Sequence, residues 1–202
     1  RRPLRAVVQW AEPAMARRLA ATVTADHLTA QSLAARGVPQ PTVLYNYPLL
    51  DVCARPDPER WANLPAAPSL LFVGTLGADR GLWLMLETLA YLRQVQGLAA
   101  RLVLVGGAKV PGLQQRIVER LRELEIVEAV DVAGYVAHDR LDGYLSRAHI
   151  GFLAHDPLIY ERNIPTKLFE YMAAGLPIVT TRAGMTAYYL ERVPAGLMVD
   201  SQ

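Results

Sequence analysis

Apolar runs alternate with amphipathic segments along residues 69–200 of the chain. The run SLLFVGTL, residues 69–76, is apolar without polar alternation, as expected for a parallel strand covered on both faces. In the segment that follows, apolar residues recur at steps of three and four, which predicts a helix with one apolar face that ends near Gly97. These apolar residues are Leu82, Met85, Leu86, Leu89 and Leu92.

The same alternation continues to residue 200. It predicts strands at 100–107, 130–136, 150–154 and 177–181, a last apolar run at 195–200, and helices at 111–126, 139–147 and 166–174. Strands and helices that alternate in this way form parallel sheets with right-handed crossovers. We therefore predict an α/β fold with a doubly wound, Rossmann-like parallel sheet.

The first 68 residues follow another pattern. They predict an amphipathic helix that includes Ala14–Ala21, a short strand near 22–24, a second helix and a strand at 42–46, which is too little for an independent sheet. Residues 48–68 contain five prolines and little periodicity. We expect residues 1–48 to be the tail of an N-terminal α/β domain, 49–68 a linker, and 69–202 a nearly whole domain, so that the chain is a fragment of a longer protein.

Composition narrows the class of protein. Hydrophobic residues make up 52% of the 202, which is enough for a full core. The formal charge of +2 creates no overall field that would recruit nucleic acid or an anionic membrane, so any anion site must be local. The single cysteine, Cys53, excludes a disulfide framework and suits a reducing cytoplasm. We expect a soluble cytoplasmic protein without a cofactor.

The first candidate site follows the first strand of the predicted sheet, because doubly wound sheets bind ligands at the carboxyl ends of their strands. The segment GTLGADRG begins with Gly74 and places Arg80 just before a helix. It matches neither the dinucleotide fingerprint nor a phosphate loop that ends in Lys-Ser/Thr. A cation beside a helix start suits a phosphate, although an arginine in a loop can equally be solvated surface.

A second candidate lies in NIPTKLFEYMAAG, where Pro165 lacks an N–H and Thr166 is expected to cap the helix. The first free amides should then fall at 167–169, and a phosphate could bind there with Lys167 as its counter-charge. Glu170 lies one helical turn further on, where its carboxylate could accept hydrogen bonds from the diol of a ribose. The alternative is an ion pair between Lys167 and Glu170 on one helix face.

The motif PTKLFEYMAAGLPIVTT, preceded by LLFVGTL and Arg80-Gly81, closely resembles the nucleotide-sugar half of retaining glycosyltransferases of GT-B architecture. This large family is typified by bacterial polysaccharide and lipid glycosyltransferases. The similarity runs over residues 69–200 and more weakly over 20–48. It implies a C-terminal donor domain in which backbone near Tyr135 and Val136 holds the base. It further implies that Arg80 and the amides of Thr166 and Lys167 meet the diphosphate, and that Glu170 holds the ribose. The donor-binding residues expected from the resemblance are Gly74, Thr75, Arg80, Tyr135, Val136, Arg162, Pro165, Thr166, Lys167 and Glu170.

The sequence departs from the family pattern in two places. The family often has Gly-Arg-Leu after the first strand, where this chain has Gly74, Thr75 and Leu76, so one of two expected diphosphate cations is absent. The position of the family's first glutamate falls on Arg162. Glu161, one residue earlier, is the candidate to face the donor sugar, and Arg162 is an alternative phosphate ligand.

The resemblance implies transfer of a glycosyl group from a nucleoside-diphosphate sugar to a hydroxyl of a saccharide or lipid-linked acceptor, with retention. The catalytic candidates are Glu161, Arg80 and Lys167, of which the two cations would stabilise the leaving diphosphate without a metal. The histidines His27, His138, His149 and His155 have no spacing that would place them on one metal ion. The acceptor site and any peripheral membrane association are expected in the rest of the N-terminal domain, so the fragment alone should be inactive. Two alternatives stay open, a nucleotide-sugar epimerase and a non-catalytic nucleotide-binding or interaction module of the same fold.

Overall fold

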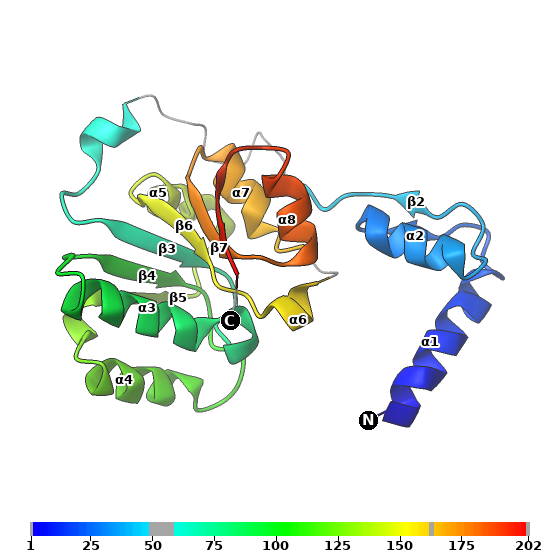
Figure 1. Ribbon diagram of the computed structural model, residues 1–202, viewed down its shortest axis with the longest axis horizontal. Coiled ribbons are helices and arrows are strands. Elements are labelled where there is room, and N and C mark those ends of the chain that lie inside the picture. The colour runs from blue at the N-terminus through cyan, green and yellow to red at the C-terminus, as the bar shows by residue number, and fades with distance from the viewer. Residues whose placement is uncertain (1, 49–58, 162–163, 201–202) are drawn as a thin grey trace. The chain divides into compact units, whose positions relative to one another are not determined.

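The computed structural model describes residues 2–48, 59–161 and 164–200. It divides into two compact units, Arg1–Tyr47 and Pro48–Gln202 (Figure 1). The first half of the predicted linker, including Cys53, and the candidate Arg162 lie outside the described residues.

The first unit contains α1 (Arg2–Ala16), β1 (Val23–Thr24), α2 (His27–Ala35) and β2 (Thr42–Val43), with β1 and β2 paired in parallel. The two short strands and the second helix confirm the prediction. The helix predicted over Ala14–Ala21 is wrong in its bounds, because the chain tightens into three-residue turns beyond Ala16. There the N–H groups of Arg18 and Leu19 donate to the carbonyls of Met15 and Ala16, which ends the helix.

The second unit carries the alternating elements that the apolar pattern predicts. In chain order they are η2 (Arg60–Asn63), β3 (Ser69–Val73), η3 (Ala78–Arg80), α3 (Leu82–Gln94), β4 (Arg101–Val105), α4 (Leu113–Glu123), η4 (Val127–Ala129), β5 (Val130–Gly134), η5 (His138–Arg140), α5 (Asp142–Leu145), β6 (Ile150–Leu153), α6 (Pro157–Tyr160), α7 (Lys167–Ala173), β7 (Ile178–Thr181), α8 (Gly184–Leu190) and β8 (Gly196–Val199). The predicted strands are confirmed, each within a few residues. Two short helices, α6 and α8, were not predicted as elements.

The six strands of this unit form one parallel sheet in the order β5-β4-β3-β6-β7-β8 (Figure 1). This order confirms the doubly wound fold. The chain starts at β3 in the middle, proceeds outward to β5, and then returns to the other side of β3 through β6. The order therefore reverses between β3 and β6, and the carboxyl ends of these two strands mark the crevice where such folds bind ligands.

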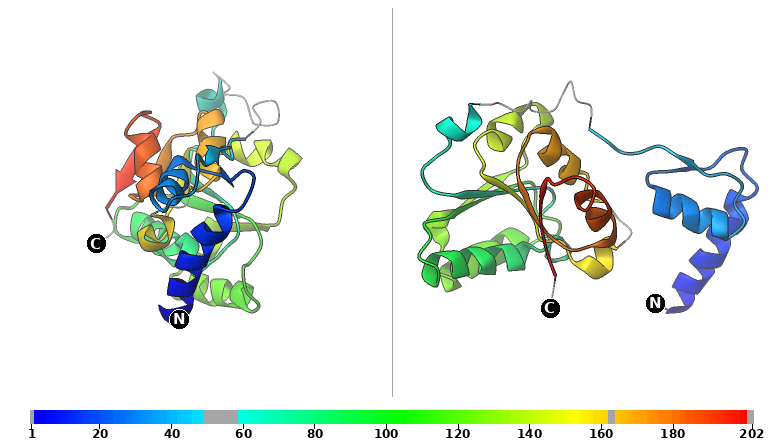
Figure 2. Two further views of the ribbon diagram at one scale, coloured as in Figure 1. Left: turned by 90° about the vertical axis from the view of Figure 1, so that its right-hand side faces the viewer. Right: turned by 45° about the horizontal axis from the view of Figure 1, so that its top comes forward.

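Successive residues of β3 contribute to separate cores on the two faces of the sheet, as the two-residue period of a strand requires. Leu70 and Phe72 pack with the buried residues of α3 and α4. Leu71 and Val73 pack on the other face with residues of α5, α7 and α8. Figure 2 gives two further views of the helices around the sheet. Helices thus cover both faces of the sheet. Because both faces are buried, the strands are apolar throughout and show no polar alternation.

The buried Tyr171 fixes α7 to the sheet. Strands β3 and β6 pair only at Leu70–Ile150 and Leu71–Gly151. Beyond these pairs the Tyr171 hydroxyl accepts from the Val73 N–H at 2.8 Å and donates to the Leu71 carbonyl at 3.2 Å. Burial raises the pKa of this hydroxyl above its usual range. The side chain joins α7 to the point where β3 and β6 separate.

Candidate functional site

A cavity of about 270 Å³ lies at the carboxyl ends of β3, β4 and β5. Its lining residues are Val73, Gly74, Thr75, Val105, Gly106, Gly107, Tyr135, Val136, His138, Leu141 and Lys167. Five residues of the sequence prediction are among them, from the ends of β3 and β5 and from the start of α7: Gly74, Thr75, Tyr135, Val136 and Lys167. The fold therefore brings together residues that are up to 93 positions apart in the chain (167 − 74).

The wall of this cavity between β3 and β4 is bare backbone. Gly106 has φ +143°, and a Cβ atom there would lie 1.9 Å from the Gly74 carbonyl oxygen, so only glycine fits. Beside this contact, the N–H groups of Thr75 and Gly107 have no hydrogen-bond acceptor among the described residues. Exposed amides at a close backbone approach are suited to the oxygens of a nucleotide ligand.

Arg80 lies at the neighbouring β3–β6 crevice because Gly81 fixes its loop there. Gly81 has φ +74°, and a Cβ atom on it would meet the Ala154 carbonyl at 1.7 Å, so the loop packs directly on the end of β6. The Arg80 Nη1 atom is 3.9 Å from the position that a Cβ of Gly74 would occupy. Arg80 thus borders the strand end that lines the cavity.

The positive charge of Arg80 is not neutralised by a carboxylate. The neighbouring Asp79 pairs instead with Lys109, whose Nζ lies 2.5 Å from Asp79 Oδ2. The hydrogen bond from Lys109 lowers the pKa of that carboxyl, which stays ionised and engaged. Within the described residues Arg80 has no ion-pair partner, and its buried Nε has no hydrogen-bond partner. An unpaired guanidinium in a strand-end crevice is suited to bind an anion.

Lys167 and Glu170 form an ion pair, as the alternative interpretation of their spacing predicted. The Lys167 Nζ lies 2.5 Å from Glu170 Oε1 and 2.6 Å from Oε2, and the two side chains are 22% and 10% exposed. Lys167 also lines the cavity, whereas Glu170 does not. Glu170 therefore holds the lysine ammonium at the cavity wall, and the pair occupies both carboxylate oxygens in this structure.

Thr166 is the N-cap residue of α7, as predicted, but its side chain does not cap the helix. Thr166 has helical backbone angles of φ −57° and ψ −26°, and its side chain makes no capping hydrogen bond. The helical turn instead closes through backbone, because the N–H groups of Leu168 and Phe169 donate to Pro165 and Thr166. Of the amides predicted to be free, at 167–169, only that of Lys167 lacks an acceptor in the described chain, and the Thr166 amide before it lacks one as well.

The remaining predicted residues do not line the cavity. Pro165 is buried before α7, and Glu161 is exposed after α6. The Glu161 carbonyl packs against Gly184, where a Cβ atom would lie 2.2 Å away. This contact places the backbone of Glu161 beside the start of α8, and no hydrogen bond joins its carboxylate to Arg80 or Lys167.

Several cavity residues were missed from the sequence. Gly106 and Gly107 end the run ARLVLVGG, and a glycine pair at a strand end was the signal that could have found them. His138 and Leu141 follow β5 closely and complete the wall opposite Gly74. His155, buried beside Arg80, follows β6 and carried no sequence signal that separates it from an ordinary loop histidine.

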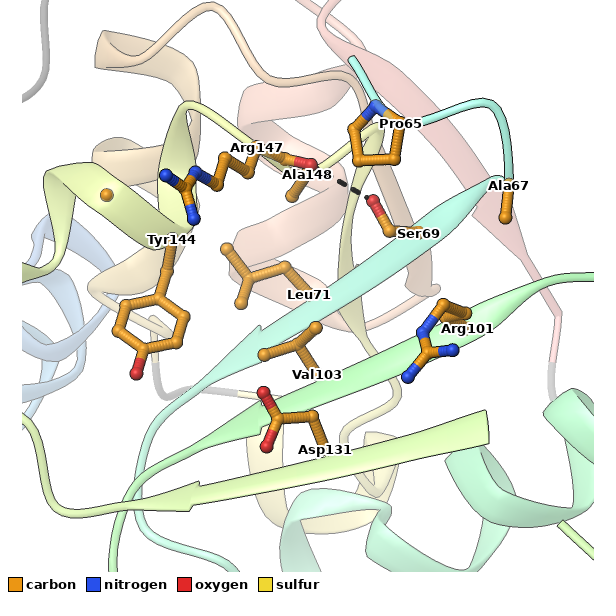
Figure 3. A pocket seen from close by; sticks show the side chains of 11 residues that line it. Pro65, Ala67, Ser69, Leu71, Arg101, Val103, Asp131, Tyr144, Arg147 and Ala148 are labelled. Atoms are coloured by element: carbon orange, nitrogen blue, oxygen red, sulfur yellow. Dashed lines mark hydrogen bonds between the residues drawn. The ribbon is translucent and has the colours of Figure 1, made fainter. Parts of the chain in front are cut away.

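A larger cavity, of about 630 Å³, lies at the opposite end of the sheet (Figure 3). Leu71 and Val103 form its floor, and Ser69, Arg101 and Asp131 come from the amino ends of β3, β4 and β5. None of the predicted site residues lies there. The smaller cavity is the better candidate despite its size, because strand carboxyl ends, unpaired amides and a cation converge on it.

Two searches of the described residues concern a metal ion and a membrane. No group of three or more His, Cys, Asp or Glu side chains in this part of the chain is placed to hold a metal ion. None of the helices found there has the length and apolar character that crossing a bilayer requires.

A family model described as "Glycosyl transferases group 1" matches residues 67–202. No curated protein sequence gives a significant match. Among solved structures, the chain is similar to the sucrose-phosphate synthase of Thermosynechococcus elongatus, with a TM-score of 0.76 and 22% identity over 96% of this chain and 48% of that chain.

The chain is also similar to HepE of Anabaena in complex with UDP-glucose, with a TM-score of 0.73 and 15% identity over 95% of this chain and 53% of that one. WaaG, a glycosyltransferase involved in lipopolysaccharide biosynthesis, has a TM-score of 0.64 and 16% identity over 89% of this chain and 49% of its own. These similarities show a shared fold. The chain spans about half the length of the structures it matches.

Proposed function

Because the chain belongs to the group 1 glycosyltransferases, we propose that its second unit binds the nucleoside-diphosphate sugar from which a glycosyl group is transferred. The observation that carries this proposal is Arg80, which has no ion-pair partner among the described residues and lies beside Gly74, a residue that lines the cavity together with Lys167. Two cations and unpaired backbone amides at strand carboxyl ends match the charge and the hydrogen-bonding needs of a diphosphate. The complex of HepE with UDP-glucose supports a donor of this class.

We assign each part of the donor to residues that line the cavity or lie beside it. The base lies against the backbone at Tyr135 and Val136, and the diphosphate lies between Arg80 and Lys167, near the Thr166 amide. Glu170 accepts from the ribose hydroxyls. In this structure Glu170 bonds Lys167, so a bound ribose would share the carboxylate with the ammonium or replace part of that contact.

Catalysis would then follow from where charge develops. As the bond from sugar to diphosphate breaks, negative charge accumulates on the leaving phosphate, and fixed cations there lower the barrier. Arg80 and Lys167 supply this stabilisation. We place Glu161 on the side of the donor sugar and expect retention of configuration through front-face attack by the acceptor hydroxyl.

The acceptor side belongs to the part of the enzyme that this chain does not cover. We propose a saccharide or lipid-linked acceptor in a cytoplasmic pathway of polysaccharide synthesis, which the similarity to WaaG supports. Holding the acceptor at reacting distance is worth about 7–11 kcal/mol of barrier in well-oriented systems. Without surfaces that do so, residues 1–202 should bind donor and transfer nothing.

Calorimetric titration of the 202-residue chain with UDP, GDP, ADP and TDP, paired with an assay for sugar transfer, tests the proposal. We expect one of these diphosphates to bind and no acceptor-dependent turnover. Absence of binding by all four would contradict the donor site, and robust transfer by the chain alone would contradict the need for a further acceptor lobe. Binding without any turnover by a chain that includes both lobes would favour a non-catalytic module.

A further inference from the structure

Arg80 lies against a pair of buried aromatic rings that the donor assignment does not use. The Arg80 Cζ atom is 5.8 Å from the centre of the Tyr160 ring. The His155 ring lies 4.1 Å from the Tyr160 ring at an interplanar angle of 30°, and Phe72 is 6.4 Å beyond His155. His155 is 4% and Tyr160 7% exposed. The guanidinium is therefore held at the edge of a packed ring cluster.

Arg80 and the buried His155 each have one shielded nitrogen that is unsatisfied within the described residues. Arg80 Nε and His155 Nδ1 are shielded from solvent and have no hydrogen-bond partner within the described chain. Folds seldom leave such atoms unpaired, since each costs free energy. Burial, followed by the charge of Arg80, lowers the pKa of His155 to about 4, so the imidazole is neutral at physiological pH. The ring therefore neither compensates nor adds to the charge of Arg80.

Backbone contacts tie this cluster to both sides of the crevice. The Thr181 hydroxyl donates to the His155 carbonyl at 2.5 Å, which fixes the chain after β6 to β7. Asp156 caps α6 by accepting from the Leu158 N–H at 2.9 Å, and the Asp156 N–H approaches the Asp79 carbonyl at 3.4 Å. The helix that carries Tyr160 thus lies beside the loop that carries Arg80 (Figure 1).

An arginine is commonly fixed in place by a carboxylate, but a carboxylate would cancel the charge that an anion ligand needs. Aromatic rings hold a guanidinium through cation–π attraction and stacking, and they leave its net charge unchanged. Asp79, the nearest acid in sequence, is engaged by Lys109. The aromatic rings can therefore position the Arg80 guanidinium without neutralising its charge.

We propose that the His155–Tyr160 ring pair is a positioning element that orders the Arg80 guanidinium at the β3–β6 crevice while it keeps the full charge available to the donor diphosphate. Tyr160 contacts the guanidinium, and His155 supports Tyr160 from within the core. The identity of the ligand in this inference rests on the proposed function. The ordering of Arg80 rests on the ring geometry alone.

The first readout is affinity for UDP and for uridine, measured by calorimetry on the 202-residue chain. Tyr160→Leu should weaken UDP roughly 3- to 30-fold, the range that loss of a buried cation–π contact gives, and should leave uridine unchanged. Tyr160→Phe keeps the ring and should stay within about twofold of the wild type. Trp83→Leu is the matched control, because it removes a second cation–π contact, to Arg116 at 5.3 Å, from the surface of α3 and α4. It should leave UDP affinity unchanged.

The second readout needs no ligand. The shielded Arg80 Nε–H should give a resolved, slowly exchanging cross-peak in proton–nitrogen NMR spectra, assigned by its loss in Arg80→Lys. That peak should persist in Tyr160→Phe and Trp83→Leu and broaden or vanish in Tyr160→Leu. Should Tyr160→Leu not fold, Tyr160→Met removes the ring while it refills most of the volume.

The two readouts separate the inference from the function on which it rests. An unchanged Arg80 peak and unchanged UDP affinity in the ringless variants would overturn the positioning role. A lost peak with unchanged UDP affinity would uphold the positioning and overturn the assignment of Arg80 to the diphosphate. Absence of UDP binding by the wild type would overturn a uridine donor, and the NMR comparison would still decide the positioning.

Discussion

At the scale of single residues, the proposed anion site combines two lysine–carboxylate pairs with an arginine that pairs with no acid among the described residues. Asp79 is bound by Lys109 and Glu170 by Lys167, whereas Arg80 has no acidic partner within the described chain. An exposed ion pair contributes little, but a buried carboxylate with both oxygens engaged, such as Glu170, resists rearrangement. Such pairs fix side chains in position before any ligand arrives.

Glu170→Gln tests whether this carboxylate serves a ribose or only the lysine. If it accepts from ribose hydroxyls, the affinity for a ribonucleoside diphosphate should fall several-fold, because glutamine keeps one acceptor oxygen but loses the charge, and the 2′,3′-dideoxy analogue should lose little. Calorimetry with both ligands gives the comparison. Equal losses for the two would leave the ion pair with Lys167 as the sole role of Glu170. An unchanged melting temperature is the control for an intact helix.

His155 should make the stability of the second unit depend on pH. Its pKa is lowered from 6.5 to about 4 in the folded state, so between these values the unfolded chain binds more protons. The contribution of the neutral His155 to the free energy of unfolding is therefore present above pH 6.5 and is lost as the pH falls toward 4. Between pH 7.5 and pH 5 it amounts to about 2 kcal/mol of the free energy of unfolding.

Urea unfolding of the wild type and of His155→Phe at both pH values measures this contribution. The variant keeps a ring in the cluster and removes the titrating group, so its loss of stability on acidification should be about 2 kcal/mol smaller. Parallel losses in the two proteins would show that His155 is not the group responsible, and that Asp79 or other carboxylates account for the acid sensitivity.

At the scale of elements, the site depends on how α7 and the loop before α3 are fixed to strand ends. Tyr171 joins α7 to β3 through its hydroxyl, and Gly81 seats the other loop on β6. Both contacts link elements that are far apart in the sequence. Each sets the position of one proposed diphosphate cation.

Tyr171→Phe should therefore lower the free energy of unfolding of the second unit more than removal of a tyrosine hydroxyl at the surface would. The change leaves the buried Val73 N–H without its acceptor, which costs about 1–3 kcal/mol. Denaturant unfolding measures the difference. Tyr91→Phe is the matched control, since its side chain is exposed and the expected change is within about 0.5 kcal/mol. Equal effects of the two substitutions would contradict the structural role of the Tyr171 hydroxyl.

The elements themselves could largely be predicted from the sequence, because apolar runs and helical periods are local signals. Strands β3 to β8 and helices α3, α4 and α7 follow from them directly. The four-residue helix α6 gives too few turns for a period to show. Helix α8 has seven residues, as α7 has, but it begins at Gly184 and lacks the Pro-Thr start signal that precedes α7. The sequence also marks Thr166 as the N-cap residue of α7, but it does not show that the backbone is already helical there and that the side chain makes no capping hydrogen bond.

The site could be predicted only in part, because only some of its residues carry a local sequence signal. Gly74, Arg80 and Lys167 are visible because strand ends and helix starts are marked in the sequence. His155, Tyr160 and the close contact of Gly106 depend on which strand lies beside which, and that is decided by long-range packing. No local pattern separates a buried positioning ring from an ordinary core residue.

At the scale of the whole molecule, the account proposes a donor-binding unit within a longer glycosyltransferase. The six-stranded sheet supplies its proposed contacts from its own strand ends, so binding should need no second lobe. Transfer should need one, because we propose that the acceptor is held at reacting distance by a further lobe. The central claim is therefore that a nucleoside diphosphate binds here through its phosphates.

The most direct test compares the best-binding nucleoside diphosphate with its own nucleoside, titrated into the wild type, Arg80→Ala and Arg116→Ala. Arg116 is the matched control, since it lies on α4 over Trp83 and away from the cavity. Arg80→Ala should weaken the diphosphate roughly 10- to 150-fold, as the loss of a charge-assisted phosphate contact of about 1.5–3 kcal/mol requires, and leave the nucleoside unchanged. Arg116→Ala should change neither affinity. If Arg80→Ala weakened both ligands equally, or neither, the diphosphate would not bind at Arg80 and the account would be wrong.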